Sequence, residues 1–203
     1  LKSRLERNYS KYRLELRHLT VLAFILISFQ VVLTLVQRSS FHELLTETQQ
    51  WYQRNTAERL ANSNSKALEL LIENMGVLDI NDSAVKQKVV QSFNIILTQQ
   101  ILEQNVEDVA IIVSRNGKTI AIDDGHELFN LLLKNEVTPN NSKHRGGIDL
   151  FEQKYEQIKK EERILSYLKD SSIFEILVPL APNGELIGVF YMENNPDFST
   201  ITT

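Results

Sequence analysis

The longest apolar run in the chain lies close to its N-terminal end. Residues Leu19 to Val36 read LTVLAFILISFQVVLTLV, which is 18 positions without a charged side chain. At about 1.5 Å per residue, a helix of this length spans about 27 Å, close to the thickness of a bilayer's hydrocarbon core. A buried core helix is the alternative interpretation, but soluble helices are rarely apolar on every side for five turns. The pattern therefore predicts a transmembrane helix over residues 19–37.

The distribution of charge gives the predicted span an orientation. Residues 1–37 carry six basic and two acidic side chains, a net charge of +4, whereas the rest of the chain has a net charge of −8. Basic residues gather on the cytoplasmic side of membrane helices. We therefore expect residues 1–18 to be a cytoplasmic, basic and amphipathic segment beside lipid headgroups. Residues 38–203 would then lie outside the inner (plasma) membrane, behind an uncleaved signal anchor.

Helical periodicity continues after the span, and neither Gly nor Pro occurs before Gly76. This pattern predicts a long helical stalk over residues 38–76 that ends at Gly76 and packs against a second copy in a homodimer. A glutamine near the middle of the span could form an interhelical hydrogen bond, worth about 1 kcal/mol. The residues that we expect to carry dimerisation and signal transmission are Gln30, Phe41, Leu45, Thr48 and Trp51.

The pattern of residues 77–195 predicts an α+β domain. Two β-hairpins are expected, residues 108–123 around Asn116–Gly117 and residues 173–193 around Asn183–Gly184. Pro179 should lie at a strand end or a sheet edge. The expected helices and loop are a helix from Asn81–Asp82–Ser83 to about residue 104, a short helix over 126–135, a polar loop over 136–147 and a charged helix over 149–170. Runs of helices and hairpins in this order give an antiparallel sheet flanked by helices, not a doubly wound parallel sheet.

Two segments carry a resemblance to a known family. They are DVAIIVSRNGKTIAID, residues 108–123, and FEILVPLAPNGELIGVFYMEN, residues 174–194. With the preceding long helix, they resemble the extracytoplasmic Cache, or PAS-like, sensor domains of bacterial transmembrane receptors, over roughly residues 40–195. The resemblance implies a ligand pocket over the sheet, parallel dimerisation and an output module such as a histidine kinase, a cyclase or a methyl-accepting domain. It also implies a second span, towards which we expect residues 196–203 to lead.

Candidate chemistry is sparse. The chain has no cysteine, which excludes disulfides and Cys-ligated metal sites. Its four histidines, at positions 18, 42, 126 and 144, do not have the spacing of a zinc motif. No catalytic constellation is evident, so we expect no enzyme activity, metal or cofactor in this segment, and the acidic balance argues against nucleic acid as a partner.

Five residues are candidates for a ligand site. Arg145, in the basic run His144–Gly147, could hold a carboxylate as a lid, although a solvated loop is the simpler interpretation. Asp123 could contact a cation, although capping of the next helix by the Asp123–Gly125 segment is simpler. Tyr155, Tyr167 and Tyr191 could line a pocket or only pack in the core; the first two are expected on one helix.

These observations favour one function and leave a second open. The first is a sensing region of a membrane-bound receptor such as a two-component sensor histidine kinase. A small-molecule ligand or a periplasmic partner would shift the long helix and pass a signal across the membrane. The alternative is a bitopic structural protein of a pilus, secretion or division complex, because such proteins also combine a short cytoplasmic arm, one span and a small α+β domain.

Overall fold

The computed structural model describes residues 2–103, 105–133, 137–138, 141–170 and 173–195, with side chains of the first two helices described for residues 17–98. The protein has an α+β fold with a long N-terminal helix and a five-stranded antiparallel sheet. The chain divides into two compact units, residues 1–51 and residues 52–203, which are described separately. The sheet lies in the second unit.

The first unit consists of the N-terminal part of α1 (Lys2–Met75). From Arg17 onward this helix is long and apolar enough to cross a membrane, and none of its most apolar 18-residue window is buried. Phe24 and Ile27 are 73% and 64% exposed. Thr34 donates its hydroxyl hydrogen to the carbonyl of Gln30 at 2.8 Å, so this polar group is satisfied within the helix. The apolar run predicted from the sequence is therefore helical, and its side chains are exposed.

The second unit is built around a single sheet with the strand order β2-β1-β5-β4-β3, every neighbouring pair being antiparallel. The strands are β1 (Val106–Arg115), β2 (Lys118–Ile122), β3 (Leu165–Leu168), β4 (Phe174–Leu180) and β5 (Gly188–Asn194). The order places β5 at the centre, where all seven of its residues are buried. The antiparallel α+β sheet predicted from the sequence is thus present, with one strand more than the two hairpins supply.

The first hairpin has the turn that its sequence predicts. Arg115 pairs with Lys118, which leaves Asn116 and Gly117 as a two-residue loop. Both loop residues have positive φ, 52° and 72°. A type I′ turn requires this conformation at both positions, and Asn-Gly adopts it at low cost. The turn therefore fixes the register of β1 against β2.

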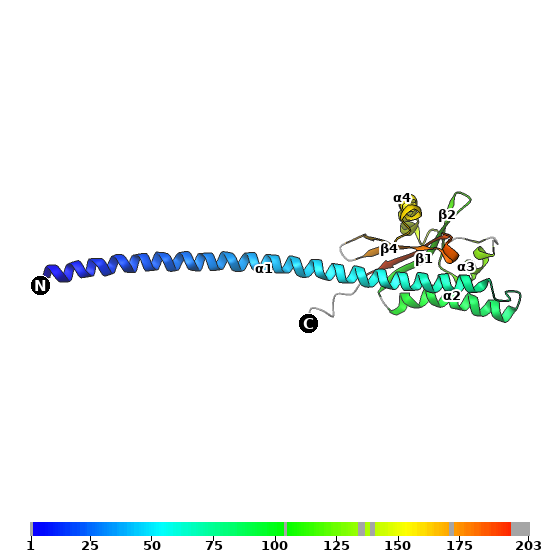
Figure 1. Ribbon diagram of the computed structural model, residues 1–203, viewed down its shortest axis with the longest axis horizontal. Helices are drawn as coiled ribbons and strands as arrows, with labels where there is room; N and C mark the ends of the chain where they lie inside the picture. Colours follow the sequence, from blue (N-terminus) through cyan, green and yellow to red (C-terminus); the bar gives the residue numbers. More distant parts are fainter. Residues whose placement is uncertain (1, 104, 134–136, 139–140, 171–172, 196–203) are drawn as a thin grey trace. The chain divides into compact units, whose positions relative to one another are not determined.

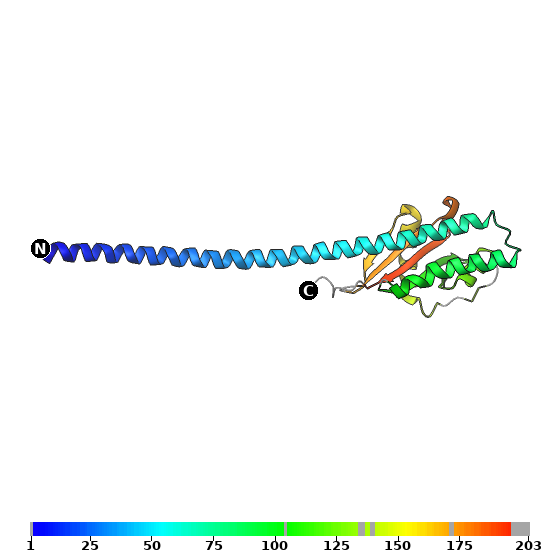
Figure 2. The same cartoon turned by 90° about the horizontal axis from the view of Figure 1, so that it is seen from below.

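Helices cover both faces of the sheet. The C-terminal part of α1 and α2 (Ser83–Glu103) lie side by side on one face, and α4 (Arg145–Glu161) lies on the other (Figures 1 and 2). The short helix α3 (Gly125–Leu132) contributes Leu128 and Phe129 to the core on the α1 and α2 side. Ala57 and Ala61 of α1 belong to that core, and both are buried. A second, smaller core lies between the sheet and α4.

The charged helix expected over 149–170 is wrong at both ends. The helix begins at Arg145, and it ends at Glu161, after which Glu162 adopts a left-handed conformation with φ of 46°. Residues 165–168 then form β3, the edge strand beside β4. The stop is invisible in the sequence because Glu162 occupies the position where Gly is the usual signal. Tyr167 is consequently on a strand and not on the helix that carries Tyr155.

Where the structure describes them, the other predicted helices and strands are close to those observed; the end of the predicted short helix, residues 134–135, and the predicted tail, residues 196–203, lie outside the described residues. The first helix ends at Met75, just before Gly76, and Asp82 caps α2 by accepting a hydrogen bond from the Ala84 amide at 2.8 Å. Pro179 lies in β4 beyond the last residue that pairs with β3, Leu177. Its missing N–H therefore costs no ladder bond, as expected for proline near a strand end.

Candidate functional site

Three acidic residues lie in register near the ends of three neighbouring strands, on the face that α4 covers. Asp108 of β1 pairs with Glu193 of β5, and Glu193 pairs with Glu175 of β4. Tyr167 of β3 continues the same line beside Glu175. We call Asp108, Glu193 and Glu175 the acidic row. Like charges directly opposite each other destabilise a sheet, so the row requires compensating groups.

The Glu193 and Glu175 end of the acidic row is compensated by one cation and one hydroxyl. Lys169 Nζ lies 2.9 and 3.0 Å from the two carboxylate oxygens of Glu193 and 3.7 Å from Glu175 Oε1. The buried Tyr191 hydroxyl lies 3.0 Å from Glu175 and 3.0 Å from Glu193. The hydrogen bond to Glu193 raises the pKa of Lys169, whereas burial and the two carboxylates raise the pKa of Tyr191. Lys169 therefore stays charged and Tyr191 stays a neutral donor.

The Asp108 end of the row is compensated by His144, which directly precedes α4. His144 Nδ1 lies 2.8 Å from Asp108 Oδ1, and Nε2 lies 3.1 Å from Asp123 Oδ2. The residue is only 1% exposed. Burial alone would lower the pKa of His144, but the hydrogen bond to Asp108 and the charges of Asp108 and Asp123 outweigh burial and raise it above the usual 6.5.

Asp123 follows β2 and binds a second cation. Its carboxylate forms an ion pair with Lys143 as well as lying beside His144. Burial raises the pKa of Asp123, but the hydrogen bond and charge of Lys143, supported by His144, bring it below the usual 3.8. Asp124, the next residue, caps α3 by accepting hydrogen bonds from the amides of His126 and Glu127. Capping of that helix, the simpler of the two expectations for this segment, is thus performed by Asp124.

The first turn of α4 closes over the acidic row. A Cβ atom at Gly147 would lie 2.8 Å from the Tyr191 ring, so the helix backbone rests directly on that ring. At Gly146 the nearest atoms would be Glu175 Oε1 at 3.5 Å and Lys169 Nζ at 3.7 Å. The basic run His144–Gly147 is therefore not the solvated loop that its composition suggests. His144 is buried, and the next three residues begin α4. Gly146 and Gly147 have no side chain, so the helix backbone can lie close to the sheet.

The five predicted ligand residues all belong to this face of the sheet or its flanks. Tyr191 is in the acidic row's hydrogen-bond network, and Asp123 is bound to Lys143. Arg145 is exposed at the first position of α4. Tyr155 packs edge-on against Phe151 with ring centroids 5.4 Å apart, while Lys154 Nζ lies 4.9 Å from the centre of the Tyr167 ring. The role of these residues in ligand binding stays a prediction.

The sequence reasoning missed most of the charged residues in this site. Asp108, His144, Lys169, Glu175 and Glu193 were absent from the predicted set. A signal for two of them does exist, because Glu175 and Glu193 are acidic residues inside otherwise apolar strands. A charge at an inward-facing strand position requires a partner, and this requirement marks a candidate site. Among the described residues, no three His, Asp or Glu side chains are grouped so that they could hold a metal ion.

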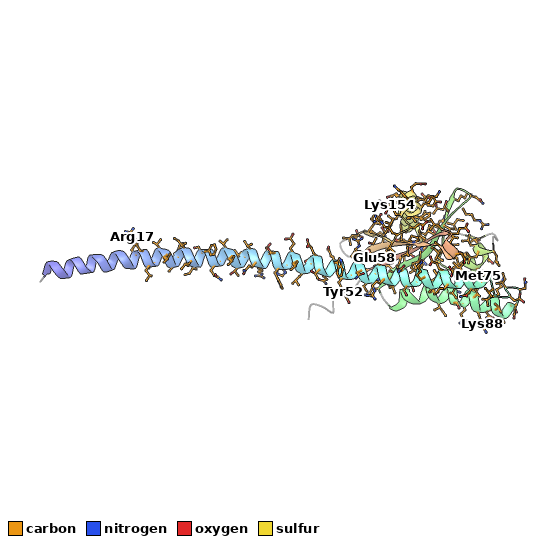
Figure 3. All side chains as sticks on the ribbon, viewed as in Figure 1. Arg17, Tyr52, Glu58, Met75, Lys88 and Lys154 are labelled. Carbon is orange, nitrogen blue, oxygen red and sulfur yellow. The ribbon has the colours of Figure 1, made fainter. Side chains whose placement is uncertain are left out.

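A second polar feature joins the sheet to α1. Arg54, Glu58, Ser65, Glu69 and Glu73 project from one side of this helix, and we call them the α1 polar stripe. Figure 3 labels Glu58 on α1 and Lys154 on α4, on opposite sides of the sheet. Arg54 Nε donates to the Ser166 hydroxyl of β3 at 2.7 Å, and that hydroxyl donates to Glu58. The N-terminal half of the stripe is thus bonded to the edge strand.

The C-terminal half of the stripe binds the end of β4 and the turn that follows it. Ser65 donates to the carbonyl of Pro179 at 3.3 Å. The carboxylate of Glu69, only 6% exposed, accepts from the Ala181 amide at 2.8 Å, and Glu73 accepts from the Asn183 amide at 2.9 Å. Backbone groups of the β4–β5 turn therefore find their partners on α1.

The predicted transmission residues lie in the first unit, on α1. Gln30 and Thr48 are exposed in the described chain, and Phe41, Leu45 and Trp51 are 59%, 48% and 63% exposed. Their role in dimerisation stays a prediction.

The chain matches no protein-family model, no curated protein and no solved structure.

Proposed function

We propose that this chain is the sensing region of a membrane-anchored receptor. The stimulus acts on the α4-covered face of the sheet, and α1 carries the response towards the membrane. The observation that carries this proposal is the α1 polar stripe. It bonds the helix that holds the apolar run to both the edge strand and the β4–β5 turn. A change in the sheet therefore has a bonded route into α1.

The site favours sensing over catalysis for a physical reason. Each carboxylate in the acidic row has a partner in the chain itself: Lys169 for Glu193, His144 for Asp108 and the Tyr191 hydroxyl for Glu175. A ligand or partner that supplied its own charge would compete with these internal pairs and shift the first turn of α4. A signal requires such a difference in affinity between two arrangements of the same site. The antiparallel sheet flanked by helices also agrees with the sensor family that the sequence resembles.

The cellular arrangement belongs to the same proposal. The apolar run of α1 spans the inner membrane, residues 38–203 lie outside it, and the chain works as a homodimer through the α1 residues around Phe41 to Trp51. The output module, such as a histidine kinase, belongs to a longer protein. The chain has no cysteine, so a single introduced cysteine reports without background.

Topology is tested with two single-cysteine variants, Ser3→Cys and Ser142→Cys. We expect a membrane-impermeant maleimide to label Ser142→Cys in cells whose outer membrane is opened, and Ser3→Cys only after the inner membrane is opened as well. The reverse pattern would refute the proposed orientation. Ser142 is exposed, so accessibility is set by the compartment and not by burial.

Sensing is tested on the full chain in lipid nanodiscs. A metabolite library is screened by thermal shift, and disulfide formation by Thr48→Cys is then compared with and without each compound found. We expect at least one compound to raise Tm and change the cross-linking rate, and Lys169→Met to reduce both effects. If compounds bind without changing cross-linking, the binding site exists but is not coupled to α1. Two results together would favour the structural alternative. In that case no compound in the library binds, and a cross-linker at residue 142 captures envelope proteins.

A further inference from the structure

The position of His144 sets a chemical requirement that goes beyond ligand sensing. Its side chain is fully buried, with Nδ1 facing Asp108 of β1 and Nε2 facing Asp123, which follows β2. A neutral imidazole has one donor nitrogen and one acceptor nitrogen. A neutral ring here would aim a lone pair at a carboxylate oxygen, whichever tautomer it adopted. The Nδ1 contact is a hydrogen bond, to Asp108 Oδ2 at 2.9 Å, whereas Nε2 lies 3.1 Å from Asp123 Oδ2 as a close charge contact without hydrogen-bond geometry. Only the imidazolium form places a positive charge between the two carboxylates.

The charges around His144 make the ring's proton necessary for local balance. Asp123 also pairs with Lys143, and Asp108 lies opposite Glu193, which is paired with Lys169. Arg145, the following residue, is exposed and lies on the first turn of α4. Loss of the proton would leave Asp108 without a cation while its register neighbour Glu193 stays negative. Opposite charge favours the protonated ring, and burial opposes it.

The same residue starts α4. The His144 carbonyl accepts the first helical hydrogen bond, from the Ile148 amide at 3.0 Å. Three residues after His144, the helix backbone rests on the Tyr191 ring. The imidazolium therefore joins β1, the end of β2 and the beginning of α4 at one point. Among the described ion pairs, Lys143 and His144 both reach Asp123, and only His144 also reaches β1.

We propose that His144 is a proton-operated clamp, which holds the first turn of α4 on the sheet while it is protonated and releases that turn when the proton is lost as pH rises. The direction follows from the sign of the shift. A histidine whose folded pKa is raised contributes its full stabilisation below the unfolded value of 6.5 and loses it as pH rises through the folded value. The clamp is a property of the fold and does not depend on the proposed sensing role.

The test uses the full chain in lipid nanodiscs, labelled with ¹³C and ¹⁵N for NMR. The four imidazoles are titrated from pH 5 to pH 10, and amide exchange is corrected for its intrinsic pH dependence. We expect His144 to titrate above pH 6.5. We also expect protection of the Ile148 amide to fall at least about tenfold across that titration. The Glu162 amide, which bonds to the Ile158 carbonyl at the other end of α4, should keep its protection.

Three variants separate the clamp from general alkaline loosening. In His144→Gln the pH-dependent step at Ile148 should disappear, whereas the matched variant His126→Gln should retain it, because His126 is exposed on α3. Asp123→Asn keeps the ring and should lower the His144 titration midpoint by about one pH unit, which gives an answer even if His144→Gln does not fold. A midpoint at or below 6.5, an unchanged midpoint in Asp123→Asn, or an equal step in His144→Gln would each overturn the proposal.

Discussion

Asp108 and Glu193 stand directly opposite each other in the neighbouring strands β1 and β5, and each is neutralised by a different cation. His144, at the start of α4, forms an ion pair with Asp108, and Lys169, in the segment after β3, forms one with Glu193. Two carboxylates in register are unfavourable for a sheet by themselves. Their coexistence therefore depends on two segments that are not part of either strand.

This dependence distinguishes the α4 face of the sheet from the opposite face. The opposite face is held by an apolar core that includes Phe93, Leu68 and Phe190, all fully buried. Apolar packing resists change because every contact contributes in the same direction. In the charged network on the α4 face, removing one charged group leaves its buried partner without a counter-charge. The two faces of the sheet thus differ in how strongly a change in charge affects them.

The Tyr191 hydroxyl is predicted to stabilise the acidic row by donating to it. Tyr191→Phe removes this donor but keeps the ring on which Gly147 rests, so buried oxygens of Glu175 and Glu193 lose a partner. We expect the free energy of unfolding to fall by about 1–3 kcal/mol, measured by urea denaturation of the chain in detergent micelles. Tyr155→Phe, on the outer side of the same core, is the matched control and should change it by less than about 0.5 kcal/mol. Equal effects of both substitutions would contradict the assigned role.

Close packing of α4 on Tyr191 predicts opposite effects at two adjacent glycines. Gly147→Ala places a Cβ atom 2.8 Å from ring carbons, so we expect a loss of about 1–3 kcal/mol from overpacking. Gly146→Ala meets only an ordinary contact at 3.5 Å and should be neutral or stabilising by up to about 1 kcal/mol, because alanine favours the helix. Thermal unfolding followed by circular dichroism distinguishes the pair. A stabilised Gly147→Ala variant would show that α4 does not rest on this ring.

How far the fold could be predicted differs between its two hairpins. The Asn116–Gly117 turn determines the register of β1 and β2, because a two-residue loop of this type allows one pairing. The connection after Leu180 is longer: Leu180 pairs with Gly188, so the turn alone does not determine which residues of β4 and β5 face each other. The helix start at Arg145 and the strand β3 were missed because local composition at residues 144–147 and at Glu162 gives no boundary signal.

The candidate site was predictable only in part for the same reason. Tyr191 and Asp123 could be chosen by chemistry and position, but the acidic row exists only once three strands are aligned. The partner of Asp108 is 36 residues away in sequence, at His144, and no local pattern connects the two. Such pairs result from tertiary packing and not from periodicity. Sequence reasoning therefore found residues of the site without finding the contacts that make it one.

The apolar run of α1 predicts a clear response to a single charge. Ile27 lies near its centre, where arginine costs about 2.5–3.5 kcal/mol for insertion into a membrane. We expect Ile27→Arg to move a substantial fraction of the chain from the membrane pellet to the supernatant after alkaline carbonate extraction. Ile27→Leu should remain in the pellet. A wild-type chain that is soluble and monodisperse without detergent would contradict the membrane assignment altogether.

The α1 polar stripe predicts that two neighbouring glutamates differ in importance. Glu69 is buried and accepts from the Ala181 amide, so Glu69→Ala leaves that amide without its acceptor and should cost about 1–3 kcal/mol. Glu73→Ala removes a similar bond to the Asn183 amide, but at an exposed position where water replaces the carboxylate, and should cost less than about 1 kcal/mol. Glu69→Gln retains an acceptor oxygen and should recover most of the loss.

Hydrogen exchange supplies the local measurement, because protection of the Ala181 amide should fall in Glu69→Ala and persist in Glu73→Ala. If Ala181 stays protected in Glu69→Ala, α1 is not bonded to the β4–β5 turn through this residue, and the proposed route from the sheet to α1 loses its central contact.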